Sequence, residues 1–182
     1  MPNQQPTIQN VRETREFVCS PVAVPVFVVD SRERVLLLSN PKYQGTWQVV
    51  CGAMERAETV LEAAMRELRE EAGPNVRARP LGGIHSYSFA YDDNVQYMIC
   101  TAYLMAYEGG DIEPGDDMAG SSYRWFTLDE IESEQLRIVV PVGQRWLFRR
   151  AVELYRMLID QPEVQLEPSR DQPPMGPYPP AG

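Results

Sequence analysis

The chain has 182 residues and a formal net charge of −9 at pH 7, from 17 Lys and Arg against 26 Asp and Glu. This length suffices for one domain with a substantial hydrophobic core, and the acidic balance argues against a surface that binds a nucleic-acid duplex. An anionic ligand would have to be received by local basic side chains or by a metal ion.

The cysteines give no sign of a disulfide framework or a zinc site. Cys19, Cys51 and Cys100 are odd in number and widely spaced, and no Cys-x-x-Cys pair is present. The chain also has no signal-like N-terminal segment and no run of about 18 apolar residues. We therefore expect a cytoplasmic protein with no membrane partner.

The first part of the chain predicts an arm followed by strands. Residues 1–17 are polar and predict an N-terminal arm, either mobile or an edge strand. The β-branched and aliphatic runs at residues 22–29 and 35–39 predict two strands paired as a hairpin. Pro25 predicts a break or bulge in the first of them, and residues 46–50 predict a short third strand.

A helix is predicted to begin close to Val60, because Thr59 and Glu62 fit a capping box. At about 100° per residue, its apolar side chains form one stripe: Leu61, Ala64, Met65, Leu68 and Ala72. Its acidic side chains gather on a different face: Glu67, Glu70 and Glu71. Like charges at this spacing destabilise a helix by a few tenths of a kcal/mol, so we expect something to compensate them.

These carboxylates allow two interpretations. Hard oxygen ligands on one helix suit Mg²⁺ or Mn²⁺, which bind a few carboxylates and take remaining ligands from water and substrate phosphates. The alternative is a solvated acidic face that Arg66 and Arg69 neutralise one turn away. For an isolated Glu-rich helix the solvated face is the better interpretation, and here the flanking glycines favour the metal site.

The second half of the chain predicts more strands and two helices. Residues 80–91 and 95–107 predict a long antiparallel hairpin around a polar turn. Both faces of its second strand are largely apolar, which predicts a sheet covered on both sides by helices. Residues 122–127 predict a strand, and residues 128–133 and 144–160 predict a short and a long helix.

The predicted domain organisation has three parts. Residues 1–17 form the arm, and residues 18–160 form one domain. Residues 161–182 are dense in proline and poor in apolar residues, which predicts a disordered tail.

The predicted helix and the loop before it carry a specific motif. Gly52 is followed by five residues, Glu58, seven residues, Arg66-Glu67-Leu68, one residue, Glu70-Glu71, one residue and Gly73. This stretch resembles the Nudix box of the Nudix hydrolases, and every charged and glycine position matches. The final position, usually a bulky aliphatic residue, is Pro74, which would end the helix. The resemblance implies an α/β fold, the Nudix-type α/β/α sandwich with a mixed sheet between helices.

The resemblance also implies a chemistry. Members of this family cleave a P–O–P bond by attack of water on phosphorus, with a divalent metal, Mg²⁺ or Mn²⁺, held by the box helix. Carried over by position, Glu67 and Glu71 are the principal ligands, Glu70 is a further ligand or base, and the Gly52 carbonyl is an additional ligand. Such a cation would neutralise developing phosphate charge and acidify water, while a nearby carboxylate takes the proton.

Other residues receive supporting roles. We interpret Arg66 as the partner of Glu58, holding loop and helix together, and Gly52 and Gly73 as structural positions of the box. Many family members recruit an acid from a distant loop. The candidates are Glu113, Asp116 and Asp117, for which a solvated turn is an equal alternative.

Substrate choice rests on weaker signals outside the box. Tyr87, Phe89 and Tyr91 alternate along one strand face and could stack an aromatic ring, although such alternation is more often ordinary sheet packing. Tyr91 resembles a tyrosine of the diadenosine polyphosphate branch. The Trp47-Gln48-Val49 lead-in resembles the branch that acts on nucleoside or dihydroneopterin triphosphates. Tyr91, Tyr87 and Trp47 are therefore the candidate substrate-binding residues.

We thus expect a hydrolase of a nucleoside diphosphate linked to another moiety, with a slight preference for triphosphates over diadenosine polyphosphates. A catalytically silent nucleotide-binding module is the alternative of another class, which the complete set of box glutamates disfavours. A Nudix-based regulator would need a DNA-binding domain, which neither the acidic balance nor the tail provides. A homodimer is left open.

Overall fold

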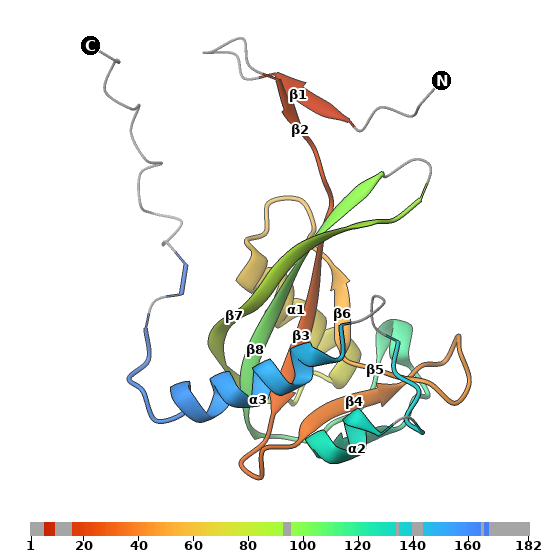
Figure 1. Ribbon diagram of the computed structural model, residues 1–182, viewed down its shortest axis with the longest axis vertical. Helices are drawn as coiled ribbons and strands as arrows, with labels where there is room; N and C mark the ends of the chain where they lie inside the picture. The colour runs from red at the N-terminus through yellow and green to blue at the C-terminus, as the bar shows by residue number, and fades with distance from the viewer. Residues whose placement is uncertain are drawn as a thin grey trace.

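The structure is a computed structural model that describes residues 6–9, 16–92, 96–133, 135–139, 144–164 and 166–167. Its main sheet contains β3 (Val22–Val29), β4 (Val35–Ser39), β5 (Trp47–Gln48), β6 (Val50–Ala53), β7 (Arg77–Ala90), β8 (Tyr97–Gly109) and β9 (Tyr123–Phe126). The helices are α1 (Val60–Ala72), α2 (Leu128–Glu132) and α3 (Trp146–Leu158), with a 3₁₀ helix η1 (Asp116–Met118). Helix α1 lies behind the sheet and α3 in front of it (Figure 1), which confirms the predicted α/β/α sandwich.

Strand β3 is the centre of the sheet. It runs parallel to β8, and β7 pairs antiparallel with β8 and forms the end of the strand order β5-β4-β3-β8-β7. On its other side β3 meets β4 only at Val29 and Val35, because β4 diverges and β6 pairs with residues 23–26 instead. The sheet therefore forks beside β3, and β6 is the branch that enters the box.

Two sequence predictions for these strands need correction. Strand β3 continues without a break through Pro25, although its pairing with β8 passes from Ala23 to Val26. This gap follows from Pro25 itself, which has no N–H to donate. The single strand predicted at residues 46–50 is divided into β5 and β6, which pair with different neighbours.

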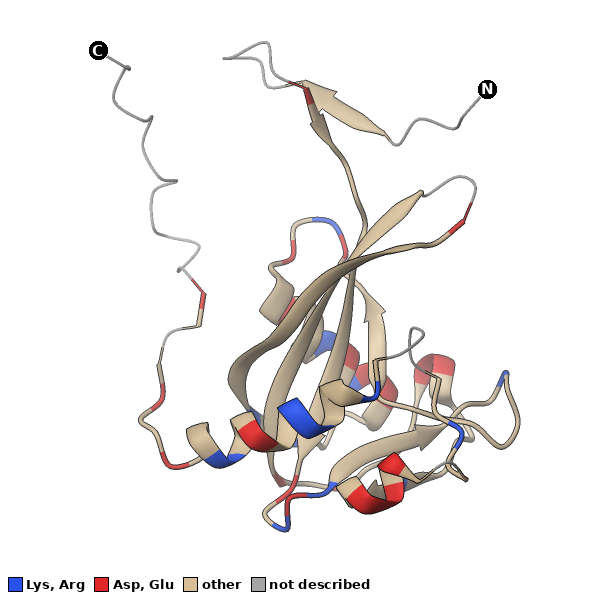
Figure 2. Cartoon of the chain, in the orientation of Figure 1, with Lys and Arg blue, Asp and Glu red and all other residues tan. Residues whose placement is uncertain are grey.

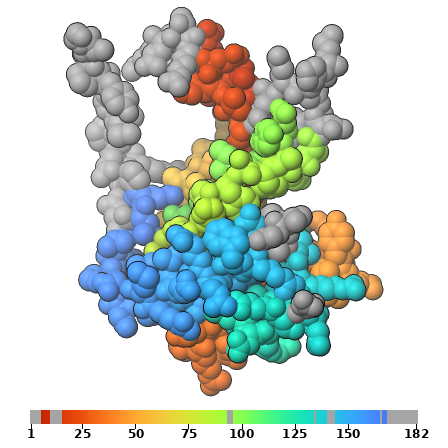
Figure 3. Space-filling view, viewed as in Figure 1, coloured from red at the N-terminus to blue at the C-terminus, as the bar shows by residue number. Residues whose placement is uncertain are grey.

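Alternate residues of β3 build the two halves of the core. Val24, Val26 and Val28 face α1, whereas Phe27 and Val29 belong to the cluster under α3. The rings of Phe27 and Phe148 meet edge to face with 5.0 Å between their centroids. In the space-filling view α3 spreads over this face of the molecule (Figure 3). The apolar second strand of the predicted hairpin is β8, which both clusters bury.

Helix α1 begins and ends as its sequence predicts. The Thr59 hydroxyl accepts from the Glu62 N–H, and the Glu62 carboxylate accepts from the Thr59 N–H, which completes the capping box. After the last turn, Gly73 adopts φ 115°, where a side chain would be strained. A Cβ at this position would also lie 2.9 Å from the backbone of Glu113, so the close approach requires glycine.

Both the predicted arm and the predicted tail contain residues that the structure places in contacts. Strands β1 (Thr7–Gln9) and β2 (Glu16–Val18) pair as a hairpin that stands apart from the main sheet in Figure 1. At the other end Leu166 packs against the core cluster beside α1, and residues 165 and 168–182 of the predicted tail lie outside the described residues. Within the described parts of the chain, none of the helices has the length and apolar character needed to span a membrane.

Candidate functional site

Glu67 of α1 lies directly on the backbone of Gly52 in β6. A Cβ at position 52 would lie 1.9 Å from Glu67 Oε1, far inside van der Waals contact. Glycine at this position therefore lets the carboxylate reach the strand, and the Glu67 residue is only 8 % exposed. Burial raises the pKa of Glu67, and hydrogen bonding and charge from Arg66 oppose that rise.

Glu71, one turn further along α1, is also held by β6. Its Oε2 accepts from the Cys51 N–H at 2.9 Å, and the residue is 5 % exposed. Burial raises the pKa of Glu71 to about 7, the Cys51 hydrogen bond opposes the rise, and the charges of Glu67, Asp117 and Asp116 add to it. A buried carboxyl poised near neutral pH is a group that can accept or release a proton.

Arg66 ties the loop before α1 to the acidic face. Its guanidinium binds Glu58 bidentately, Nε to Oε1 at 2.7 Å and Nη2 to Oε2 at 3.0 Å, and donates to the Ala53 carbonyl at 2.9 Å. The predicted Arg66–Glu58 pair is thus present. The Nη1 nitrogen also donates to Glu67 Oε1 at 2.7 Å and Glu70 Oε2 at 2.9 Å. These bonds, led by those to Glu58, raise the pKa of Arg66 further above its ordinary value. Acidic and basic residues both occur on α1 in Figure 2.

This arrangement bears on the predicted metal site. Among the described residues, no three His, Cys, Asp or Glu side chains converge as a ready-made set of ligands, and Arg66 and the Cys51 N–H bind the carboxylates instead. The donor set nevertheless fits Mg²⁺ or Mn²⁺. Glu58, Glu67 and Glu70 share one guanidinium, so negative charge exceeds positive charge on hard oxygen donors. Glu67, Glu71, Glu70 and the Gly52 carbonyl are the groups that would hold the ion.

The loop acids divide into two kinds. Glu113 serves α1 through its backbone, since its N–H donates to the Ala72 carbonyl at 2.9 Å. Asp116 and Asp117 lie close enough to Glu71 for their charges to raise its pKa. The Asp117 carboxylate is also 3.5 Å from the Lys42 ammonium at an exposed position. Asp116 and Asp117 are therefore better placed than Glu113 to add a distant acid.

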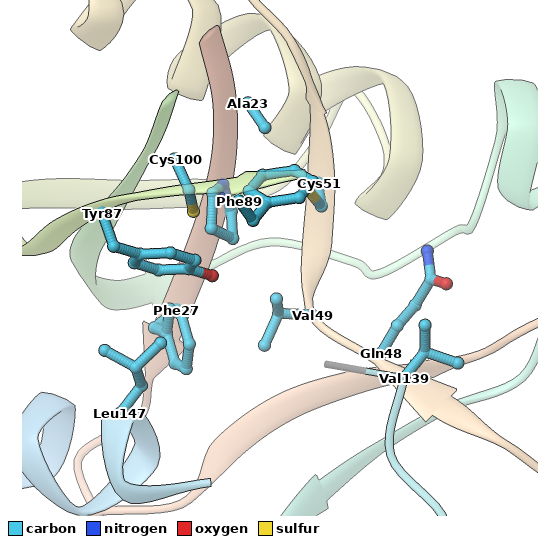
Figure 4. A pocket seen from close by; sticks show the side chains of 11 residues that line it. Ala23, Phe27, Gln48, Val49, Cys51, Tyr87, Phe89, Cys100, Val139 and Leu147 are labelled. Carbon is cyan, nitrogen blue, oxygen red and sulfur yellow. The ribbon is translucent and has the colours of Figure 1, made fainter. Parts of the chain in front are cut away.

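A cavity of about 250 Å³ lies beside β6 (Figure 4), and Cys51, not Gly52, belongs to its lining, so it is on the face of β6 opposite the carboxylates. Its lining is apolar apart from one amide, one phenol and two thiols: Ala23, Pro25, Phe27, Gln48, Val49, Cys51, Tyr87, Phe89, Cys100, Val139 and Leu147. Because no lining residue is charged, the cavity suits a neutral ring and not a phosphate. Cys51 lines the cavity with its side chain and donates its N–H to Glu71. The cavity and the carboxylates therefore lie on either side of the same strand residue.

The candidate substrate-binding residues have different positions. Tyr87 lines the cavity, and burial raises the pKa of its hydroxyl. Trp47 packs on Phe126 in the core with 4.9 Å between ring centroids, and its neighbour Gln48 lines the cavity instead. Tyr91 is 61 % exposed and contacts Phe89 outside the cavity. His85, interpreted as a strand residue, is in β7 beside Tyr87 and Trp146.

Sequence reasoning did not find Cys51 and Cys100 as lining residues. In the β7–β8 hairpin Cys100 is paired with Tyr87, and Cys51 immediately precedes Gly52 in a strand. Alternation along these strands, combined with the register of the hairpin, is the signal that relates the thiols to the aromatic residues.

Comparison with known proteins finds relatives of moderate sequence identity that are named as hydrolases or pyrophosphatases. In sequence, the chain is 26 % identical over 108 residues to an uncharacterised Nudix hydrolase of Bacillus subtilis, covering 58 % of this chain and 66 % of that protein. It is 28 % identical over 111 residues to an ADP-ribose pyrophosphatase of Methanocaldococcus jannaschii, covering 60 % and 64 %. The matched part is thus somewhat less than two thirds of the length of these curated relatives.

Solved structures share the fold at low sequence identity. A NUDIX hydrolase from Nitrosomonas europaea superimposes with a TM-score of 0.58 at 24 % identity, covering 87 % of this chain and 84 % of that one. A model of the NUDIX domain matches residues 20–147, well over half of the chain and the whole of the box. The chain therefore belongs to the NUDIX domain family.

Proposed function

We propose that the protein is a divalent-metal-dependent hydrolase that cleaves a P–O–P bond in a nucleoside diphosphate linked to another moiety. The observation that carries the proposal is the position of Glu67 and Glu71, which α1 buries against the β6 backbone at Gly52 and Cys51. Burying two carboxylates costs free energy unless they are paired, hydrogen-bonded or coordinated to a metal, and a cation bound between them would offset that cost.

Each residue has a role that its environment allows. Mg²⁺ or Mn²⁺, when bound, would supply charge neutralisation for the phosphates and acidify a water molecule. Glu67 and Glu71 hold the ion, and Arg66 keeps the loop and helix in register through Glu58. Glu70 is the most accessible of the three, with a side chain 41 % exposed, so it is the carboxylate best placed to take a proton from water.

The cavity supports a ring-bearing substrate. A base or other neutral aromatic ring that fills it lies one residue from the carboxylates, with its phosphates outside the uncharged lining. The relatives fit this substrate class: their names include an ADP-ribose pyrophosphatase, an NAD-capped RNA hydrolase and an 8-oxo-dGDP phosphatase. Within the class we prefer nucleoside or nucleoside-like triphosphates, because the Trp47-Gln48-Val49 lead-in brings Gln48 and Val49 to the cavity.

A nucleotide screen tests the proposal. The full chain is incubated with nucleoside triphosphates, nucleoside diphosphate sugars and dinucleoside polyphosphates, with Mg²⁺, Mn²⁺ or a chelator, and products are separated by chromatography. We expect metal-dependent release of a nucleoside monophosphate or pyrophosphate. Tight nucleotide binding without turnover under every metal condition would favour the silent binding module instead.

A diadenosine polyphosphate hydrolase is the second candidate, and Tyr91 is the residue that favours it. A kcat/KM for diadenosine tetraphosphate at least tenfold above that for every triphosphate would establish this preference. The exposed position of Tyr91 outside the cavity is the reason we rank it second.

The cytoplasmic location stays a prediction, and the homodimer stays an open question. The β1–β2 hairpin exposes Ile8, Phe17 and Val18, which are apolar groups that a second copy would cover. Sedimentation equilibrium of the full chain and of an Ile8→Asp, Val18→Asp variant tests the dimer, and fractionation of the source cells tests the location.

A further inference from the structure

The chain passes from one face of the sheet to the other after α3. Helix α3 packs on the face that carries Phe27, and the segment after it follows the end strand β7, where Gln161, Pro162 and Glu163 line a surface hollow with Arg79 and Pro80. Leu166 then joins the core cluster on the opposite face, beside α1. Residues 161–164 and 166–167 thus wrap the edge of the sheet between the two long helices, and Figure 1 shows this path beside β7. We call this segment the strap.

The strap docks where β7 is irregular. The pairing of β7 with β8 shifts register between Pro80 and Gly82 and again between Gly83 and His85. Gly82 has φ 131°, and the Leu166 Cδ2 lies 3.8 Å from the place where its Cβ would be. A Cβ at this distance would make an ordinary van der Waals contact with Leu166, so the positive φ and not a lack of space favours glycine at position 82.

Glu167 ends the strap on the first turn of α1. Its Oε1 accepts from the Leu61 N–H at 2.9 Å, which is one of the amides at a helix start that has no partner within the helix. The Thr59 hydroxyl accepts a hydrogen bond from the Glu62 N–H in the same turn. Two amides of this turn are therefore held, one by the local capping box and one by a residue 106 positions away.

Glu167 also contacts the sheet, through Tyr103. The residue is buried in β8 and forms a side-chain hydrogen bond with Glu167. Burial, the charge of Glu167 and this hydrogen bond together raise the pKa of the tyrosine hydroxyl, so the hydroxyl stays protonated and donates. The Glu167 carboxylate is fixed between a strand and a helix start, where the helix dipole also favours a negative charge.

We propose that Glu167 is a positioning residue for the box helix, and that the strap fixes the N-terminal turn of α1 and thereby the loop that carries Glu58. The activity part of the proposal depends on the hydrolase function proposed above, and the structural part does not. Glu58 directly precedes the Thr59 cap, and its partner Arg66 also binds Glu67 and Glu70. Fraying of the first turn would therefore reach the carboxylates through Arg66.

The test compares three variants of the full chain. Glu167→Ala removes both hydrogen bonds, Glu167→Gln keeps an acceptor without the charge, and Glu163→Ala changes an exposed acid of the same strap as the matched control. Hydrogen exchange of the Leu61 amide is the local readout, and kcat and KM with the best substrate of the nucleotide screen are the functional one.

We expect Glu167→Ala to speed exchange of the Leu61 amide about fivefold, the scale of a lost helix cap. The same change should lower kcat more than it changes KM, because the carboxylates and not the cavity are disturbed. Glu167→Gln should restore most of both values, and Glu163→Ala should match the wild type.

Two results would overturn the proposal. Unchanged Leu61 exchange in Glu167→Ala would mean that the contact does not hold the helix start. Faster exchange with unchanged kcat would reduce Glu167 to a purely structural residue. If the wild-type protein hydrolyses no nucleotide, the proposed function fails, and the exchange data still decide whether the strap fixes α1.

Discussion

Helices α1 and α3 have the same length, 13 residues, and cover opposite faces of one sheet, yet they bury different chemistry. The buried residues of α3 are Leu147, Phe148, Ala151, Val152 and Tyr155. Those of α1 are Ala63, Ala64, Glu67, Leu68, Glu71 and Ala72. Helix α3 thus follows the rule that an amphipathic helix packs its apolar side, and α1 breaks it twice.

The difference separates a helix that serves stability from one that also serves a site. The three alanines of α1 are buried in the core cluster, and Gly52 admits the Glu67 carboxylate. Charged residues of α3 remain outside, where Arg149 pairs with Glu132 and Arg156 with Glu33 on the surface. A local departure from good packing is thus the physical mark of the site.

The largest expected effect is on kcat, and it comes from removing the charge of a glutamate on α1 but not of one on α3. Glu71→Gln and Glu70→Gln keep side-chain size and should each lower kcat by roughly a hundredfold or more, because a metal ligand or base is lost. Glu153→Gln, at an exposed position of α3, should leave kcat within twofold. Steady-state rates with Mg²⁺ and Mn²⁺ make the measurement, and wild-type turnover in both α1 variants would end the assignment of the site.

Removing an arginine from each helix should change the free energy of unfolding by different amounts. Arg66→Ala leaves Glu58, Glu67 and Glu70 without their shared cation and should cost about 3 to 5 kcal/mol, because the Arg66 side chain is only 20 % exposed. Arg149→Ala removes a surface pair and should cost less than about 1 kcal/mol. Urea denaturation gives both values, and an unchanged stability with lost activity in Arg66→Ala would indicate direct contact with a phosphate.

The dependence on pH distinguishes a buried acid from a surface acid. The pKa of Glu71 in the folded protein, about 7, lies above its unfolded value, so its stabilising contribution is full below about pH 4.5 and is lost as pH rises through 7. In the presence of a chelator the wild type should lose on the order of 3 kcal/mol over this window.

Glu71→Gln supplies the control for this pH prediction. It cannot titrate, so its melting temperature should vary less between pH 5 and pH 8 than that of the wild type. Added Mg²⁺ should stabilise the wild type more at pH 8 than at pH 5, since only the ionised carboxylate binds a cation. Parallel pH profiles for the two proteins would contradict the raised pKa.

The smallest expected effect concerns the face that α3 covers. Tyr87→Ala removes an aromatic ring from the cavity lining. The resulting loss of kcat/KM for triphosphates should correspond to a free energy of roughly 1 to 3 kcal/mol, the scale of base stacking. Tyr91→Ala should change the same rates by less than about twofold. A selective loss of diadenosine tetraphosphate turnover in Tyr91→Ala would reverse this ranking and favour the second substrate class.

Local signals predicted much of this arrangement. The Thr59 and Glu62 capping box, the end of α1 at Gly73 and the Arg66–Glu58 pair all depend on residues close in sequence, and the structure contains each of them. The strand boundaries of β3 and β4 were also predicted, because their β-branched runs are bounded by polar turns.

Long-range pairing was beyond the sequence patterns. Nothing local to residues 46–50 indicates that β5 and β6 separate to pair with β4 and β3. The low apolar content that predicts disorder for the tail likewise does not reveal that Glu167 meets Leu61. Trp47 was a candidate for the substrate because of its motif, and its packing on Phe126 follows from tertiary contacts that no single segment encodes.

The alternation along β6 has an evolutionary consequence. Gly52 faces the box helix and Cys51 faces the cavity, so a single layer of backbone separates the carboxylates proposed for bond cleavage from the cavity proposed for recognition. Mutations in β7, β8 or α3 can reshape the cavity without moving a carboxylate. If the proposed roles hold, lineages that share this box can change the ring that the cavity accepts while the carboxylates stay as they are.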